Sequence, residues 1–314
     1  MNFSASRDQF RQSVIDFGTL AELLADPDLD LGPLATLAPG LKLDGTRLGY
    51  IGDSFGSVLG SLVASVDPRY RAMVLNVGGG GILIELISHG PLLGSIIGSL
   101  GGLTFGVPYD RLNFQHPIVN LLQPVLDGAD PLSYSDFLVR EPVTVEATGS
   151  PKSIVLIEVL WDELMANEGT EALASAAGIP LAEPNVGENG GLQLERASPS
   201  GGEIRDVPDA GRTVVLVQAS PATHGSNLYG ERGIREYALP FARSEDTGLF
   251  PKLPSPFEIR QPYLGLQNMA VRFMRSAFED QTPVVAELPV PTRDFDDDGV
   301  PDDADDEPWN PDAN

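Results

Sequence analysis

The sequence between residues 47 and 77 contains two short apolar runs separated by a glycine-containing turn and a helix-forming stretch. The runs RLGYIG (47–52) and RAMVLNV (71–77) are typical of buried strands. The stretch 54–65 has a helical pattern, which Asp67-Pro68 ends because proline cannot continue a helix. A strand, a helix and a strand within about 30 residues form a βαβ unit, whose strands are parallel and joined by a right-handed crossover. The chain is therefore predicted to have an α/β fold built on a parallel sheet.

Other segments carry patterns that extend this unit. Apolar residues recur every three or four positions in 6–25 and in 264–279, as they do on one face of a helix. The remaining helices are predicted over 118–126, 133–138 and 168–177. Buried strands are predicted over 153–160 and 212–218, and a loop over 26–46, while 183–211 is a polar, glycine-rich excursion.

The composition excludes several classes of partner and chemistry. With 20 basic and 45 acidic residues the net charge is −25, so nucleic acid and anionic membrane surfaces would be repelled. The chain of 314 residues has no cysteine, which excludes disulfides, zinc–thiolate sites and a cysteine nucleophile. Residues 1–12 lack a basic segment followed by an apolar one, so we expect no signal peptide in this chain and a cytoplasmic location as expressed.

The segment 78–107 is strongly apolar and rich in glycine. A membrane-spanning helix over 90–107 has the minimal length of about 18 residues, but Glu85 and His89 precede it and Gly90-Pro91 disfavours a helix. A buried core segment is a second interpretation. We favour a third, an apolar cap over a pocket within about residues 78–150, and expect no membrane span.

The sequence Gly52-Asp53-Ser54-Phe55-Gly56 follows the first strand of the βαβ unit and matches the pattern G-x-S-x-G. In a nucleophile elbow this pattern holds a serine in a strained turn, and the two glycines let strand and helix approach closely. The flanking strand and helix favour this interpretation, with Ser54 as the nucleophile. The alternative is a glycine–serine turn that only begins a helix.

A serine hydroxyl needs a base that accepts its proton, and the chain contains three histidines. His89 lies in the apolar segment and His116 precedes a proline, so we expect cap or core roles for both. His224 lies six residues after the strand 212–218, in a predicted loop. We predict that His224 is the base.

The base needs an acidic partner that fixes its tautomer, and the expected chain order is serine, acid, histidine. The strand 153–160 is followed by Trp161-Asp162-Glu163. Asp162 leaves the strand first and is the predicted acid. Glu163 is the alternative, and a surface carboxylate without a catalytic role is the third interpretation.

Three blocks of the sequence resemble the α/β-hydrolases, specifically the large extracellular lipase/esterase family of Gram-negative bacteria. They are RDQFRQS at 7–13, the elbow at 52–56 with Asp53 where many relatives have histidine, and the pair of segments 162–167 and 223–225. The resemblance covers roughly residues 5–280. It implies an α/β-hydrolase-like, mostly parallel sheet flanked by helices, with an apolar cap insertion.

The chain departs from this family before the elbow. Only 46 residues precede the first predicted strand, and they show a helix and a loop where the family has several strands. The loop that carries the second oxyanion donor is therefore expected to be absent, which leaves the backbone N–H of Phe55. We interpret the chain as an N-terminally shortened hydrolase, and its uncovered sheet edge favours a homo-oligomer.

The last 21 residues, 294–314, contain ten acidic residues and no lysine or arginine. Their acids have the spacing of a calcium loop, with a turn glycine at position 6 of the loop. The predicted ligands are Asp294, Asp296, Asp298, Asp302 and Asp305. The pattern resembles the Ca²⁺-binding repeats of thrombospondin type 3 more than an EF-hand. A solvated acidic tail is the alternative.

These features predict a hydrolase domain over 1–290 and a calcium-binding tail over 291–314. The predicted function is that of an esterase or lipase, which cleaves small-molecule or lipid carboxylic esters without a catalytic cofactor. The calcium pattern predicts a secreted or cell-surface parent protein. The alternative is a weakly active or inactive hydrolase-fold interaction module with a calcium-binding tail.

Overall fold

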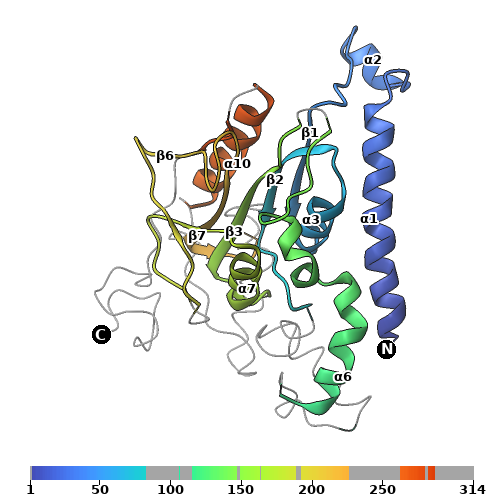
Figure 1. Ribbon diagram of the computed structural model, residues 1–314. Coiled ribbons are helices and arrows are strands. Elements are labelled where there is room, and N and C mark those ends of the chain that lie inside the picture. The colour runs from blue at the N-terminus through green and yellow to red at the C-terminus, as the bar shows by residue number, and fades with distance from the viewer. Residues whose placement is uncertain are drawn as a thin grey trace, which may run out of the picture.

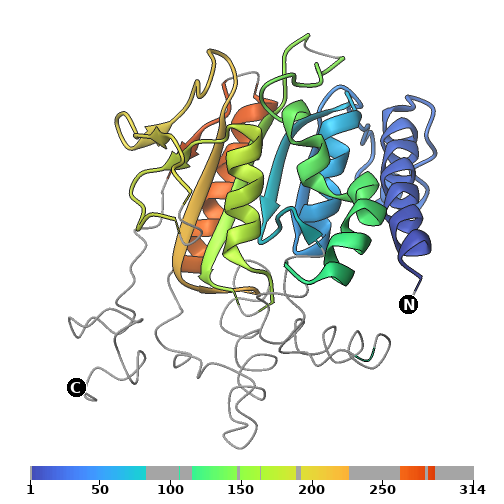
Figure 2. The same cartoon turned by 60° about the horizontal axis from the view of Figure 1, so that its bottom comes forward.

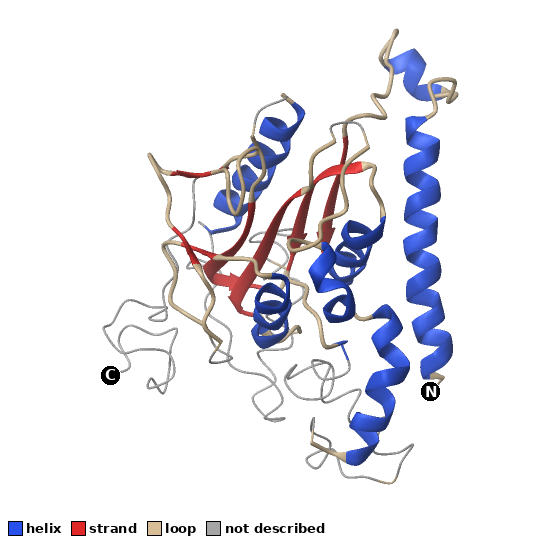
Figure 3. Ribbon diagram, in the orientation of Figure 1, coloured by secondary structure: helices blue, strands red, loops and turns tan. Residues whose placement is uncertain are grey.

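The computed structural model describes residues 2–82, 106, 115–146, 149–162, 164–188, 192–225, 262–279 and 282–286. Within them, a parallel sheet carries helices on both faces, which confirms the predicted fold class (Figures 1 and 3). The helices are α1 (Phe3–Ala25), α2 (Pro33–Leu37), α3 (Phe55–Val66), α6 (Pro117–Leu126), α7 (Asn167–Ala177) and α10 (Pro262–Phe278), with the 3-10 helices η2 (Asp127–Ala129) and η3 (Pro131–Phe137). The strands are β1 (Leu48–Asp53), β2 (Tyr70–Asn76), β3 (Ser153–Trp161), β4 (Leu181–Ala182), β5 (Arg196–Ala197), β6 (Glu203–Ile204), β7 (Val214–Thr223) and β8 (Val285–Ala286).

Over the described ranges, the main sheet has six strands in the order β1-β2-β3-β7-β4-β5, and every neighbouring pair is parallel. Helix α3 connects β1 to β2, so the predicted βαβ unit is confirmed. Among the described residues β1 lies at the edge of the sheet, and the side chain of Ile51 is 57% exposed there. The strands β6 and β8 form a separate antiparallel pair.

Alternate residues of the central strands face two different hydrophobic cores, because successive side chains of a strand point to opposite faces. Val155 and Ile157 of β3 pack on the face that α10 covers, where Phe273 is fully buried. Ile154 and Leu156 pack on the opposite face, beneath α3 and α7 (Figure 2). A strand buried on both faces has a mostly apolar sequence, which explains the clear signal of 153–160.

Helix α1 packs outside α3, at the end of the sheet that β1 forms (Figure 1). The ring of Phe17 meets that of Tyr50 edge to face, with centroids 5.4 Å apart. The hydroxyl of Tyr70 donates to the Phe17 carbonyl at 3.1 Å. These contacts attach α1 to β1 and β2, so the first 25 residues belong to the same packed unit as the elbow.

Several predicted boundaries are wrong. Strand β7 continues to Thr223, five residues beyond the predicted strand 212–218. The polar, glycine-rich segment 183–211, for which no strand was predicted, contains the short strands β5 and β6. The helix predicted over 133–138 is the 3-10 helix η3. Strands of two residues leave no periodic pattern, so the sequence carries no signal for them.

Some predictions concern residues outside the described ranges. These are the apolar segment from residue 83 to 105, His89, Glu163, the domain boundary at 290 and the tail 294–314. Among the helices that the structure describes, none combines the length and apolar character needed to cross a membrane.

Candidate active site

Ser54 connects β1 to α3 in a backbone conformation that few L-amino acids adopt. Its φ is 55° and its ψ is −120°, and it is the N-cap residue of α3. The Ser54 N–H donates to the Asn76 carbonyl at 2.9 Å, and the Ser54 carbonyl accepts from the Ser57 N–H at 2.8 Å. Such strained residues persist only where the surrounding structure holds them. The sheet on one side and the helix on the other therefore hold this serine in its turn.

The two glycines of the elbow have different surroundings. A Cβ atom on Gly52 would lie 2.4 Å from the carbonyl oxygen of Gly56, so β1 and α3 approach backbone to backbone at this point. A Cβ on Gly56 would meet only the Tyr50 hydroxyl, at 3.9 Å. That hydroxyl donates to the Gly56 carbonyl at 2.6 Å. The predicted need for glycine at both positions is therefore wrong for Gly56, because only Gly52 lacks space for a side chain.

Asp162 and His224 leave the sheet side by side, because β3 and β7 remain paired to their last residues. Trp161 lies opposite Thr223 in this parallel ladder. His224 therefore follows its strand directly. The sequence had suggested that it lies six residues beyond the strand. Its Nδ1 lies 2.8 Å from Oδ1 and 2.9 Å from Oδ2 of Asp162.

The Asp162 carboxylate is buried and oriented by the backbone that follows it. Its side chain is 3% exposed, and that of His224 is 8% exposed. Its Oδ1 accepts from the N–H groups of Leu164 and Met165 at 2.9 and 2.8 Å. An ionised carboxylate can only accept hydrogen bonds, so Nδ1 of His224 carries the proton and Nε2 is the basic nitrogen of the neutral ring.

Asp53 brings the elbow into electrostatic range of this pair. The Nδ2 of Asn76 donates to Oδ1 of Asp53. Burial raises the pKa of Asp53, the Asn76 hydrogen bond and the electrostatic interaction with His224 lower this pKa, and the Asp162 carboxylate raises it. The residue before Ser54 thus interacts with both His224 and Asp162 across the carboxyl-terminal edge of the sheet. No sequence motif pointed to Asn76, although an asparagine at the end of the strand after the elbow was a usable signal.

Phe55 lies at the N-terminus of α3, where helical N–H groups have no partner within the helix. Its ring is 52% exposed and meets Phe10 of α1 edge to face, with centroids 4.7 Å apart. Phe10 belongs to the block 7–13, which resembles the hydrolase family. The first helix therefore contacts the elbow directly.

His116 makes a helix-capping contact in the structure. It is the N-cap residue of α6, and its Nδ1 accepts from the Ile118 N–H at 3.2 Å.

In the described part of the chain, no group of three or more histidine, aspartate or glutamate side chains is arranged to hold a metal ion. The five aspartates predicted to bind Ca²⁺ lie outside that part. An apolar cavity of about 210 Å³ lies between α1, α3 and η3, with Leu62 and Val66 in its wall. These two residues lie about 12 and 18 Å along the helix from Ser54, so the cavity is separate from the elbow.

No protein-family model matches the sequence, and no curated protein matches it. Three solved structures to which the chain is similar are an acylaminoacyl peptidase from Pyrococcus horikoshii, an esterase from Pyrococcus furiosus and an acetyl xylan esterase from Thermoanaerobacterium. Their identities are 15%, 13% and 13%, with TM-scores of 0.32, 0.29 and 0.31. The matches cover 64%, 66% and 66% of this chain and 23%, 54% and 49% of theirs. The chain thus spans less than two thirds of each of these proteins, all of which are hydrolases by name.

Proposed function

We propose that the chain is a serine hydrolase that cleaves carboxylic esters, with Ser54 as nucleophile, His224 as base and Asp162 as the acid that orients the base. The observation that carries this proposal is the strained serine between a parallel strand and a helix, at the sheet edge where a buried Asp–His pair emerges. Buried Asp–His pairs also occur as structural elements. A serine held in a strained turn at the same sheet edge as such a pair is consistent with nucleophilic catalysis, which needs all three side chains.

The proposed reaction has two halves. His224 Nε2 accepts the proton of the Ser54 hydroxyl while the Ser54 oxygen bonds to the ester carbonyl carbon. The tetrahedral intermediate then expels the alkoxide, which accepts this proton from His224 and leaves as the alcohol. An acyl-enzyme remains. Water repeats the sequence on the acyl group and releases the carboxylic acid. Asp162 stays ionised throughout and stabilises the imidazolium that forms twice in each turnover.

The N–H of Phe55 is the proposed donor to the oxyanion. Removal of one oxyanion donor typically lowers kcat by about 10²–10³-fold. We therefore expect slow turnover unless a second donor is present. An ester substrate is proposed over a peptide because the segment 78–107, which follows β2 in the sequence, is apolar and would suit an acyl chain.

The test is hydrolysis of p-nitrophenyl butyrate by the wild type, Ser54→Ala and Ser57→Ala. Ser57 is a matched control, since it is buried in the same helix and its hydroxyl has no hydrogen-bond partner among the described residues. We expect Ser57→Ala to keep its activity and Ser54→Ala to lose at least about 10³-fold. Equal rates for the wild type and Ser54→Ala would remove the assignment.

Labelling with a fluorophosphonate tests the activation of Ser54 without assuming the natural ester. The expected result is a mass increase on the peptide that contains Ser54, only in the folded protein and not in Ser54→Ala. Labelling of another serine, or none at all, would contradict the proposal.

The second candidate function is an interaction module with little or no activity. It is favoured by the position of β1 at the edge of the sheet that the described residues form, where Ile51 is exposed, since an open strand edge can pair with another chain. This function predicts concentration-dependent self-association, which Ile51→Lys abolishes in light-scattering measurements. A monomeric wild type that hydrolyses esters would exclude it.

For the segment 294–314 we propose Ca²⁺ binding and, with it, a secreted or cell-surface parent protein. Trp309 lies four residues after Asp305 and is one of two tryptophans in the chain. Tb³⁺ bound at these aspartates should emit when Trp309 is excited, and the emission should fall when Ca²⁺ is added. Emission that persists in Trp309→Phe would place the ion elsewhere.

A further inference from the structure

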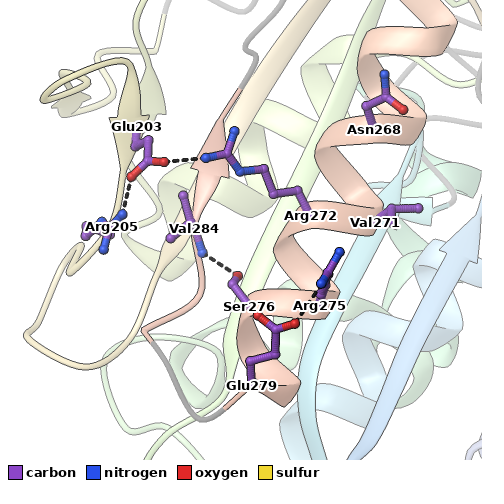
Figure 4. A pocket seen from close by; sticks show the side chains of 9 residues that line it. All are labelled: Glu203, Arg205, Asn268, Val271, Arg272, Arg275, Ser276, Glu279 and Val284. Carbon is purple, nitrogen blue, oxygen red and sulfur yellow. Dashed lines mark hydrogen bonds and ion pairs between the residues drawn. The ribbon is translucent and has the colours of Figure 1, made fainter.

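A polar groove of about 480 Å³ lies on the outer face of α10, between this helix and the pair β6–β8. Figure 4 shows Glu203 between Arg205 and Arg272, with Arg275 turned toward Glu279. Arg272 Nη2 lies 2.5 Å from Glu203, and Arg275 Nε lies 2.7 Å from Glu279. The groove is on the opposite face of the sheet from α3, so it is separate from the candidate active site.

The charge of this groove is unusual for the molecule. Acidic residues outnumber basic ones by 45 to 20 over the chain, yet the groove has three guanidinium groups and two carboxylates. Glu203 is shared by two of the three arginines. A guanidinium carries five N–H donors and binds carboxylates in a bidentate manner. Arg205 and Arg275 each pair with a single carboxylate among the described residues, and their side chains are 47% and 75% exposed.

We propose that this arginine groove binds the acidic segment 294–314 of the same chain. The segment carries ten acids and no lysine or arginine, so its charge is complementary to the groove. Three arginines on one face of an acidic protein create a local positive potential, and this potential attracts an acidic segment. The inference does not depend on the proposed esterase activity.

The connection between groove and segment has a suitable length. Val284 lines the groove, and strand β8 ends at Ala286, two residues later. From Ala286 to Asp294 the chain can extend up to about 26–29 Å. The groove runs along α10 from Asn268 to Glu279, which is about 17 Å of helix. The acids can therefore reach every arginine of the groove, and such a short tether gives an effective concentration of about a millimolar.

Calcium and the groove would compete for the same carboxylates, because an aspartate that binds Ca²⁺ has fewer oxygens left for a guanidinium. The experiment is therefore performed with a chelator present. The chain contains no cysteine, so Ala304→Cys creates a single attachment point for a nitroxide label in the full-length protein. Paramagnetic broadening of backbone amides by this label is then measured by NMR.

We expect the label to broaden the amides of Val271, Arg275 and Ser276 and to leave those of Ser13 and Thr19 in α1 unchanged. The double variant Arg205→Gln/Arg275→Gln should weaken docking by about tenfold and restore the α10 signals, since each surface ion pair contributes little alone. High salt should restore them in the wild type, because 1 M salt shortens the screening length to about 3 Å.

The matched control is Arg7→Gln/Arg11→Gln, which changes the net charge equally on a distant helix. It should leave the broadening of α10 intact. Sharp α10 signals in the wild type, or the same loss of broadening in both double variants, would overturn the proposal. Broadening that survives both Arg205→Gln/Arg275→Gln and high salt would also overturn it, because the contact would then not depend on the arginines.

Discussion

Substitution of Gly52 by alanine tests the close approach of β1 and α3 that shapes the elbow. The new Cβ would lie 2.4 Å from the Gly56 oxygen, 2.6 Å from the Gly56 carbonyl carbon and 2.6 Å from Cε1 of Tyr50. Two of these atoms belong to the backbone, so no change of rotamer can relieve the overlap. The strand and the helix must separate, and the 2.6 Å hydrogen bond from Tyr50 to Gly56 is then lost.

The cost follows from these two effects. Overpacking of a tight site costs about 1–3 kcal/mol, and a lost hydrogen bond about 0.5–1.5 kcal/mol. We therefore expect Gly52→Ala to lower the free energy of unfolding by about 2–4 kcal/mol. A displacement of about 1 Å at the nucleophile can cost 10²-fold in rate, so activity should fall by at least that factor under conditions where the variant is still folded.

Gly56→Ala is the control, because a Cβ at this position has space. Alanine is favoured over glycine inside a helix by up to about 1 kcal/mol, so this variant should be as stable as the wild type or slightly more stable. Urea unfolding measures both free energies, and p-nitrophenyl butyrate hydrolysis measures the rates. The reasoning is refuted if Gly52→Ala has the wild-type urea midpoint, or if Gly56→Ala is the more destabilised of the two.

Three further predictions concern other buried or capping groups. Burial lowers the pKa of Lys152 from 10.5 to about 8. Between pH 8 and 10.5 the folded protein therefore binds fewer protons than the unfolded chain, so the free energy of unfolding of the wild type rises with pH in this range. Lys152→Met should thus be more stable than the wild type by up to about 3 kcal/mol at pH 7, and this difference should shrink as the pH rises to 10.5. A difference of the same size at pH 7 and above pH 10.5 would contradict this. Asp162→Asn should lower kcat by about 10⁴-fold at unchanged stability, because an amide facing Nδ1 of His224 imposes the wrong tautomer; a small kcat effect would show that the pair is structural. His116→Ala should cost about 1 kcal/mol of unfolding free energy through the lost cap on the Ile118 N–H, and a fall in esterase rate would show that its role extends beyond the cap.

The sequence was sufficient for the elements that have strong periodic patterns. The strand β3 is buried on both faces, and its apolar run, which only Glu158 interrupts, identified it to within one residue. The helix predicted over 168–177 ends where α7 does, and Gly178 follows it with a φ of 79°, which suits glycine. Chain order and strand ends then sufficed to select Asp162 and His224, whose side chains the structure brings into hydrogen-bond contact.

The end of β7 was missed for a physical reason. Pro221 lies within the strand, and proline removes a backbone donor, so the sequence there resembles a loop. The structure accommodates it with a register shift: Val159 pairs with Ala219, but Trp161 pairs with Thr223. Extra residues on one strand are a β-bulge, a feature that redirects the side chains that follow it. This local irregularity places His224 beside Asp162, and no periodic pattern could have predicted it.

The strain in the backbone is concentrated where the candidate site lies. Among the described residues only Ser54, Val77 and Asp206 combine a positive φ with a side chain. Ser54 and Val77 directly follow the neighbouring strands β1 and β2, and a branched residue such as valine at φ 46° is a clear steric outlier. The N–H groups of both residues donate to carbonyls of the next strand, those of Asn76 and Ile157. These hydrogen bonds of the sheet hold both residues in their strained conformations. Ligands of open α/β sheets bind at the carboxyl ends of the strands, and strained residues gather where a fold sacrifices stability for function. Two such residues side by side at that edge are independent support for a functional site, since neither the pattern G-x-S-x-G nor the Asp162–His224 pair requires strain at Val77.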